Sequence, residues 1–246
     1  MARTTPALLA LRPVLPILLG ASLLLSLAMG LRQSLGLFMP AITRDVGVSV
    51  ADFTLAIALQ NLVWGLLQPI AGAWAARAGF GRIMLTGAGL YLLALLVLAQ
   101  AHSLAGVMLG AGVLVGAAMA CTGSAIGMAV AARSVSAASR SMVLGMVSAA
   151  GSLGALVAAP LGQGLLQAWG WRAGVLGFAV LAAFMLPAAW VAGRTDRQPL
   201  PPAATGADGQ ALVNGLDGLR ATQAVLAALR TAPFLVMAAA YFVCGM

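Results

Sequence analysis

The sequence predicts an all-α membrane protein, a polytopic bundle of six transmembrane helices arranged as 3+3 inverted repeats, followed by the start of a seventh helix. Composition supports this prediction, because 62% of the 246 residues are hydrophobic and only 7% are charged. Soluble domains carry roughly 25% charged residues, so a water-soluble fold is excluded. The chain also divides into apolar stretches of about 20 residues, the length that crosses about 30 Å of hydrocarbon.

Six of the apolar stretches are long enough to span a bilayer at a helical rise of about 1.5 Å per residue. They cover residues 13–39, 53–75, 83–101, 104–131, 142–166 and 173–191. We assign these spans and their short connections to one domain, the six-helix transmembrane bundle of residues 1–193. The first span follows two arginines, as a signal peptide does, but it is too long and five more spans follow it, so we expect no cleavage.

The remainder of the chain differs in character. Residues 194–232 carry charges and prolines, and we expect them to form a cytoplasmic linker. The last 14 residues, 233–246, are apolar but would reach only about 21 Å as a helix. We therefore expect a truncated seventh transmembrane helix, with a missing carboxy-terminal six-helix half, or a second copy of the chain, as its partner.

The net charge of +8 comes from 13 basic residues, all of them arginines that stand singly along the chain. Because nucleic-acid sites need clustered basic residues, we expect no nucleic-acid partner. If the spans alternate across the membrane, ten arginines lie on the amino-terminal side and only Arg44 and Arg172 lie on the other. The positive-inside rule then predicts a multi-pass protein of the cytoplasmic (inner) membrane, in contact with the lipid bilayer, with a cytoplasmic amino terminus.

Each group of three spans has glycine and arginine next to the end of its second span. The segments are 79–82 (Gly-Phe-Gly-Arg) and 170–172 (Gly-Trp-Arg), on opposite sides of the membrane in the topology above. Inverted repeats of three spans, nested in a six-span half, are the building plan of the major facilitator superfamily of secondary transporters.

The segment 72–82 (GAWAARAGFGR) resembles that superfamily's loop between spans two and three. Gly72, Arg77, Gly79 and Arg82 stand at glycine and basic positions of the loop, whose role in the family is conformational. Ala76 stands where the family has an acidic residue, which removes the expected carboxylate partner of a charge latch. The resemblance implies the amino-terminal half of a transporter that works by alternating access.

Further segments look like the monocarboxylate and oxalate/formate porters of the superfamily: residues 30–38, 56–65 and 241–245. This resemblance implies a small organic anion as substrate, met by a cation in the first span. The Gly- and Pro-rich fifth span resembles that of many antiporters, which leaves drug or amphiphile efflux as an alternative. A non-transporting six-span sensor or assembly protein, binding through residues 194–232, is a further alternative.

Arg32 is the one charge well inside a predicted span. A charge at that depth costs about 2.5–3.5 kcal/mol on insertion scales and is a functional candidate by default. A guanidinium offers a planar fork of donors suited to a carboxylate, so we predict that Arg32 binds the substrate anion. The alternative is that the first span ends near Leu31 and Arg32 reaches the outer surface.

Other polar residues of the spans are candidates to line the substrate site. Gln60, Trp64 and Gln68 recur every four residues and share a face of the second span with Asn61. Such a stripe indicates either a water-filled cavity or a hydrogen-bonded seam between helices. Weaker evidence supports five further candidates, because Ser and Thr can also bond to their own helix backbone. These are Tyr91, Thr122, Ser124, Ser148 and Ser152.

The sequence shows no set of residues arranged for catalysis. His102 is the only histidine, and no nucleophile and base stand together, so we expect neither an enzyme nor a cofactor. Cys121 and Cys244 have no Cys or His at ligand spacing, so we expect no disulfide and no metal. No aspartate lies within an apolar core to shuttle a proton. The five aspartates are Asp45, Asp52, Asp196, Asp208 and Asp217.

Overall fold

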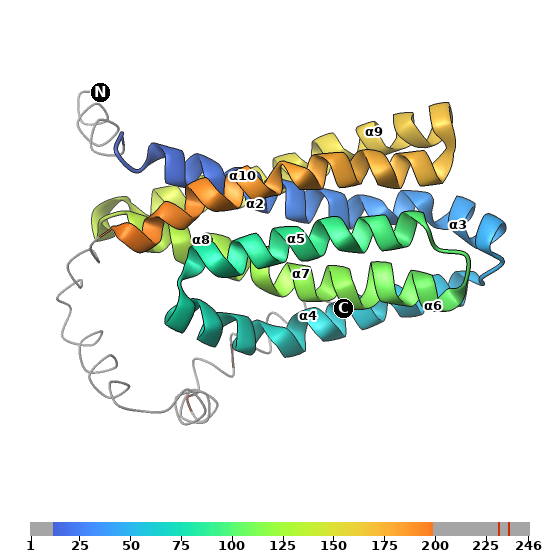
Figure 1. The fold of residues 1–246 in the computed structure, drawn as a ribbon. Coiled ribbons are helices and arrows are strands. Elements are labelled where there is room, and N and C mark those ends of the chain that lie inside the picture. Colours follow the sequence, from blue (N-terminus) through green and yellow to red (C-terminus); the bar gives the residue numbers. More distant parts are fainter. Residues whose placement is uncertain (1–11, 199–230, 232–235, 237–246) are drawn as a thin grey trace. The chain divides into compact units, whose positions relative to one another are not determined.

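The computed structural model describes residues 12–198, 231 and 236 of the chain (Figure 1). Residues 12–198 lie within one compact unit, and the description below concerns that unit alone. Nearly all of these residues are helical, and no strand is present among them. The expected linker beyond residue 198, the expected seventh helix and Cys244 lie outside the described residues, apart from Thr231 and Val236.

The first helical run is one continuous rod made of α2 (Leu15–Ser34), η1 (Leu35–Phe38) and α3 (Met39–Val46). The 3-10 turn η1 comes just before Pro40, which has no backbone N–H to donate to the preceding turn. The rod ends at Gly47, whose φ of 74° is the left-handed conformation that commonly closes a helix.

Two helices follow in opposite directions. A capping box begins α4 (Val50–Ala78): the Asp52 amide donates to Ser49 Oγ at 3.1 Å and the Ser49 amide donates to the Asp52 carboxylate at 3.0 Å. The chain then turns at Gly79 and returns as α5 (Phe80–Ala99).

The fourth helical run consists of α6 (Leu104–Val107), the π-helix η2 (Met108–Leu114), α7 (Val115–Thr122) and α8 (Ser124–Ser134). Gly123, with extended backbone angles, separates α7 from α8. The run therefore crosses the bundle as one segment. Its conformation changes from α-helical to π-helical at Met108 and back to α-helical at Val115.

The longest helix, α9 (Ala137–Ala183), is two arms joined at Gly170, where φ is 81° and ψ is 174°. The arms fold back on each other. A Cβ added at Gly162 would lie 2.7 Å from Phe178, and one added at Gly177 would lie 2.6 Å from Leu165. The second arm continues through α10 (Met185–Ala192) and η3 (Gly193–Arg197).

Five helical segments of the described chain are long and apolar enough to cross a membrane. The fifth, Ala137–Arg197, has 61 residues and contains the reversal at Gly170, so it supplies two arms. The six arms confirm the all-helical membrane bundle that the sequence predicts. The last arm extends past residue 193, because Thr195 of η3 is fully buried and its hydroxyl lies 2.9 Å from that of Ser134.

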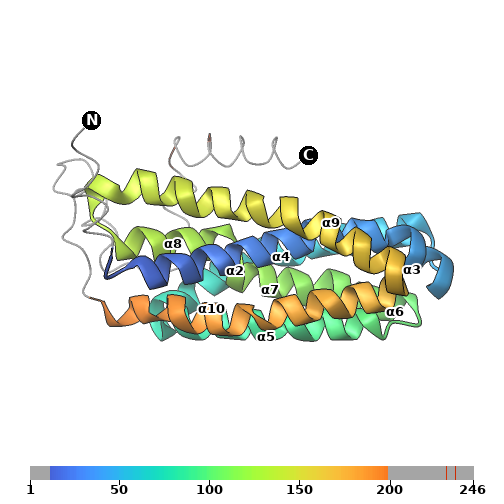
Figure 2. The ribbon, with the colours of Figure 1, turned by 90° about the horizontal axis from the view of Figure 1, so that it is seen from above.

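Close helix crossings hold the bundle together. Helix α2 lies between the first arm of α9 and α10 (Figure 2). A Cβ added at Gly30 would lie 2.5 Å from the carbonyl oxygen of Gly154, and one added at Gly20 would lie 2.8 Å from that of Ala188. In lipid, such small residues let helices approach and gain van der Waals contact.

The two halves of the unit mirror each other in their turns. Gly79, between the second and third arms, has φ 91° and ψ 157°, close to the angles of Gly170 between the fifth and sixth arms. Because the arms alternate in direction, these turns lie at opposite ends of the bundle. This correspondence is what two inverted repeats of three helices require.

Each turn is held by a carboxylate from the other repeat. Asp196 accepts hydrogen bonds from the amides of Phe80 at 2.9 Å and Gly81 at 2.8 Å. At the other end, Asp45 pairs with Arg172 and also accepts from Trp171 Nε1 at 2.9 Å. We name these contacts the Asp196 clasp and the Asp45 clasp.

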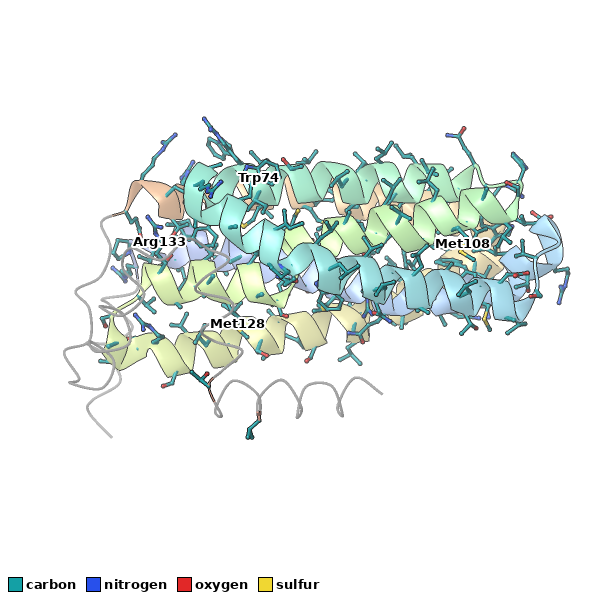
Figure 3. The ribbon with its side chains drawn as sticks, turned by 90° about the horizontal axis from the view of Figure 1, so that it is seen from below. Trp74, Met108, Met128 and Arg133 are labelled. Carbon is teal, nitrogen blue, oxygen red and sulfur yellow. The ribbon has the colours of Figure 1, made fainter. Side chains whose placement is uncertain are left out.

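Arginines gather at one end of the bundle. Seven lie at the helix ends on that side, whereas Arg44 and Arg172 lie at the opposite end. Arg133, labelled in Figure 3, belongs to the arginine-rich end, and Met108 lies toward the other. The seven are Arg12, Arg77, Arg82, Arg133, Arg140, Arg194 and Arg197.

Candidate substrate site

Arg32 lies in the interior of the first helical rod. The rod continues for 14 residues to Val46, so Arg32 stands about 20 Å from that end of the bundle. Its side chain is half-buried. This geometry disfavours the alternative in which the helix ends near Leu31 and the guanidinium reaches the outer surface.

The Arg32 guanidinium contacts three residues of one face of α4. Its Nε donates to Gln60 Oε1 at 2.9 Å, and its Nη2 donates to Asn61 Oδ1. The guanidinium carbon also lies 5.0 Å from the centre of the Trp64 ring, within the range of a cation–π interaction. The structure thus brings together four of the residues that the sequence singles out.

Gln60 is fixed on both sides of its amide group. It is 1% exposed, and its Nε2 donates to the carbonyl of Ala111 in η2 at 2.7 Å. This bond orients the amide so that Oε1 faces Arg32. Gln60 therefore belongs to a hydrogen-bonded seam between helices, whereas Asn61 on the same stripe is exposed.

Arg32 keeps donors available after these contacts. A guanidinium has five N–H groups, and two of them are used here, the Nε–H and one of the two on Nη2. The remaining donors are both N–H groups of Nη1 and one of Nη2, and these two nitrogens form the end-on fork, which suits a carboxylate. No carboxylate among the described residues pairs with Arg32, since the one ion pair found there joins Arg172 to Asp45.

The other predicted site residues form no hydrogen bond with this cluster. Tyr91 is fully buried, and its hydroxyl donates to the carbonyl of Ala28 at 3.0 Å. Thr122 is also buried, and its hydroxyl donates to the Ala118 carbonyl at 2.8 Å. Both hydroxyls are therefore paired with backbone carbonyls in this conformation. Half-buried Gln68 makes no hydrogen bond within residues 12–198.

The three serine candidates, Ser124, Ser148 and Ser152, lie at the wall of a cavity between α2, α8 and α9.

The loop at 72–82 forms the turn between α4 and α5. Gly79 adopts a φ of 91°, which only glycine adopts without strain. Gly72, Arg77 and Arg82 are exposed, and neither arginine forms an ion pair with another described residue. The turn is held instead by the carboxylate of Asp196.

Comparison with known families decides the identity of this fold. The model of the Major Facilitator Superfamily matches residues 19–246. The chain belongs to the Major Facilitator Superfamily. Members of this superfamily are membrane transporters and not enzymes, so the protein is a multi-pass membrane transporter. The comparison with curated proteins finds no match.

Two contacts of this superfamily member have no local pattern in its sequence. Asp196 lies in the predicted linker of residues 194–232, and Ala76 leaves the loop without its own acid. At the opposite end, Arg172 also donates to His102 Nδ1 at 3.3 Å and to the Ala101 carbonyl at 3.4 Å. The Asp45 clasp therefore joins three connections at that end of the bundle.

Proposed function

We propose that this superfamily member is a secondary transporter that moves a small organic anion, such as a monocarboxylate, by alternating access. The observation that supports the proposal is the state of Arg32: a cation held inside a membrane bundle by neutral amide oxygens and an aromatic ring. Monocarboxylate and oxalate/formate porters, which segments of the sequence resemble, transport substrates of this class.

The chemistry of Arg32 favours an anion over a neutral ligand. An unpaired charge inside a membrane bundle costs about 2.5–3.5 kcal/mol, and amide oxygens contribute no opposite charge. A carboxylate would accept two parallel hydrogen bonds from the end-on fork and neutralise the cation. Trp64 and Asn61 stand beside that fork and would contact the rest of the ligand.

Alternating access requires a second bundle. We propose that the six arms described here rock against a partner bundle, either a carboxy-terminal half or a second copy, with the substrate between the two near the bilayer midplane. The arginine-rich end would face the cytoplasm of a cell whose inner membrane holds the protein. The described aspartates accept hydrogen bonds at helix ends, so exchange of one anion for another is the coupling that needs no further group.

Counterflow in proteoliposomes tests this function. Vesicles containing the full chain are preloaded with unlabelled lactate or gluconate, and entry of the same labelled anion is followed. We expect uptake by the wild type, loss of uptake in Arg32→Gln, and strong reduction in Arg32→Lys, which keeps the charge without the planar fork. Arg44→Gln removes an exposed arginine at the end of the same rod and is the matched control.

Two results would contradict the proposal. Normal carboxylate counterflow in Arg32→Gln would remove its basis. Transport that is blocked by tetraphenylphosphonium, a lipophilic cation, and is indifferent to carboxylates would favour efflux of amphiphiles instead.

A further inference from the structure

A second polar site lies beside α2 and is lined by residues of α8 and α9 rather than of α4. It is a cavity of about 300 Å³ between α2, α8 and α9. Four polar side chains line it: Gln33, Ser124, Ser148 and Ser152. Met128, labelled in Figure 3, adds a thioether from α8 where that helix lies beside α9. We name this space the serine cavity.

The polar groups of the serine cavity are unpaired within the described chain. Elsewhere in the bundle the hydroxyls of Thr86, Thr122 and Ser134 donate to the carbonyl four residues earlier, at 2.8–3.0 Å. Neither Gln33 nor any of the three cavity serines forms such a bond with a described residue. Their donors and acceptors are therefore available to a ligand in the cavity.

The serine cavity lies at the depth of Arg32. Gln33 follows Arg32 directly in α2, so the two side chains leave the helix at one level and about 100° apart. Ser152 stands two residues before Gly154, where the first arm of α9 crosses α2 at Gly30. The cavity is open, because Gln33, Ser148 and Ser152 are exposed in the described bundle. Unpaired polar groups at this depth are costly in lipid, which favours water or a polar ligand in the cavity.

We propose that the serine cavity is a subsite for the hydroxyl groups of the transported anion, so that the substrate is a hydroxylated carboxylate of the sugar-acid type rather than a plain alkyl acid. The proposal rests on the proposed function, because Arg32 holds the carboxylate end. Serine hydroxyls and the Gln33 amide both donate and accept, as a chain of substrate hydroxyls requires. Two thioethers, of Met29 and Met128, offer adaptable apolar contact to its carbon backbone.

Gluconate and hexanoate form a matched pair of probes, since hexanoate is the same carbon chain without hydroxyl groups. Calorimetric titration of the full chain in nanodiscs should show gluconate binding at least about tenfold more tightly, because a site built for hydroxyls rejects an analogue that lacks them. In the double variant Ser148→Ala/Ser152→Ala we expect gluconate affinity to fall about tenfold and hexanoate affinity to stay unchanged. Ser141→Ala, on the same helix outside the cavity, is the control and should bind as the wild type does.

The outcomes separate this inference from the function on which it rests. If the double variant binds gluconate normally while Arg32→Gln has lost both probes, the serine cavity is not a subsite but the anion site stands. If Arg32→Gln binds both probes normally, the proposed function itself is wrong. Equal weakening of both probes in the double variant would also overturn the subsite. Ser124→Ala repeats the test from α8 should the double variant fail to fold.

Discussion

Gln60 ties Arg32 to the backbone of a third helix, because the amide that accepts from Arg32 at 2.9 Å also donates to Ala111 at 2.7 Å. The Ala111 carbonyl lies in η2, the π-helical stretch of the fourth helical run, and π-helical turns often occur at functional sites. The position of the Arg32 guanidinium therefore depends on the π-helical conformation of η2, to which it is linked only through Gln60. Gln60 acts as a positioning residue for Arg32.

Replacement of Gln60 separates its two roles. Gln60→Leu leaves the Ala111 carbonyl and the Nε–H of Arg32 without their partner, so we expect the free energy of unfolding to fall by about 1–3 kcal/mol. Gln60→Glu is nearly isosteric and places a carboxylate beside Arg32, which should abolish carboxylate binding in a folded protein. Thermal unfolding in detergent and titration with gluconate measure the two effects. Unchanged gluconate affinity in Gln60→Glu would show that the end-on fork of Arg32 is not the anion site.

The crossing of α2 and α9 sets a second prediction. A Cβ added at Gly154 would lie 2.0 Å from the carbonyl oxygen of Ser26, which no helix crossing accommodates. Gly154→Ala must push the helices apart, and we expect a loss of about 1–3 kcal/mol in unfolding free energy. Gly145→Ala, on the same arm with no atom within 4 Å of the added Cβ, is the control and should be neutral or slightly stabilising. Thermal melts that fail to separate the two variants would argue against this crossing.

The Asp196 clasp predicts graded losses in the free energy of unfolding for variants at the α4–α5 turn. Asp196→Ala removes the acceptor of two amides at the start of α5, and we expect a cost of about 1 kcal/mol in unfolding free energy, as for a lost helix cap. Asp196→Asn keeps one acceptor oxygen and should cost less. Exposed Arg197, one residue further, provides the control variant Arg197→Ala. If all three variants melt together, the clasp contributes nothing to stability.

The Asp45 clasp should behave as an exposed ion pair. The Asp45 and Arg172 side chains are 49% and 38% exposed, so salt screens their attraction. A double-mutant cycle with Asp45→Ala and Arg172→Ala should give a small stabilising coupling that vanishes at about 1 M salt. The hydrogen bond from Trp171 to Asp45 does not depend on the charge of Arg172. A large coupling that survives high salt would contradict this description.

Hydropathy predicted the bundle because lipid imposes a strict length on apolar helices. The predicted spans 53–75 and 83–101 correspond to α4 (Val50–Ala78) and α5 (Phe80–Ala99). The differences lie at the ends, where a capping box and a glycine turn, rather than apolar residues, decide where a helix begins and ends. Glycine turns at 79 and 170 were visible in the sequence because their spacing follows the repeat.

Side-chain partners were harder to predict than spans. Helical periodicity placed Gln60 and Trp64 on one face, but it does not state which neighbouring helix meets that face. Tyr91 and Ser124 are both polar residues of spans, yet one hydroxyl is bonded internally and the other lines a cavity. Asp196 reaches an amide 116 positions earlier in the chain, a contact that no local pattern contains.

The two clasps have a mechanical consequence for the bundle. Each repeat holds the turn of the other repeat through one clasp, and the two clasps lie at opposite ends of the bundle. Sliding of one repeat past the other would therefore break a clasp. In the alternating access that we propose, a six-helix bundle held at both ends would tilt as a rigid body, so a displacement at one end would be accompanied by an opposite displacement at the other. Weakening either clasp should therefore make the helix bundle more flexible before the bundle unfolds.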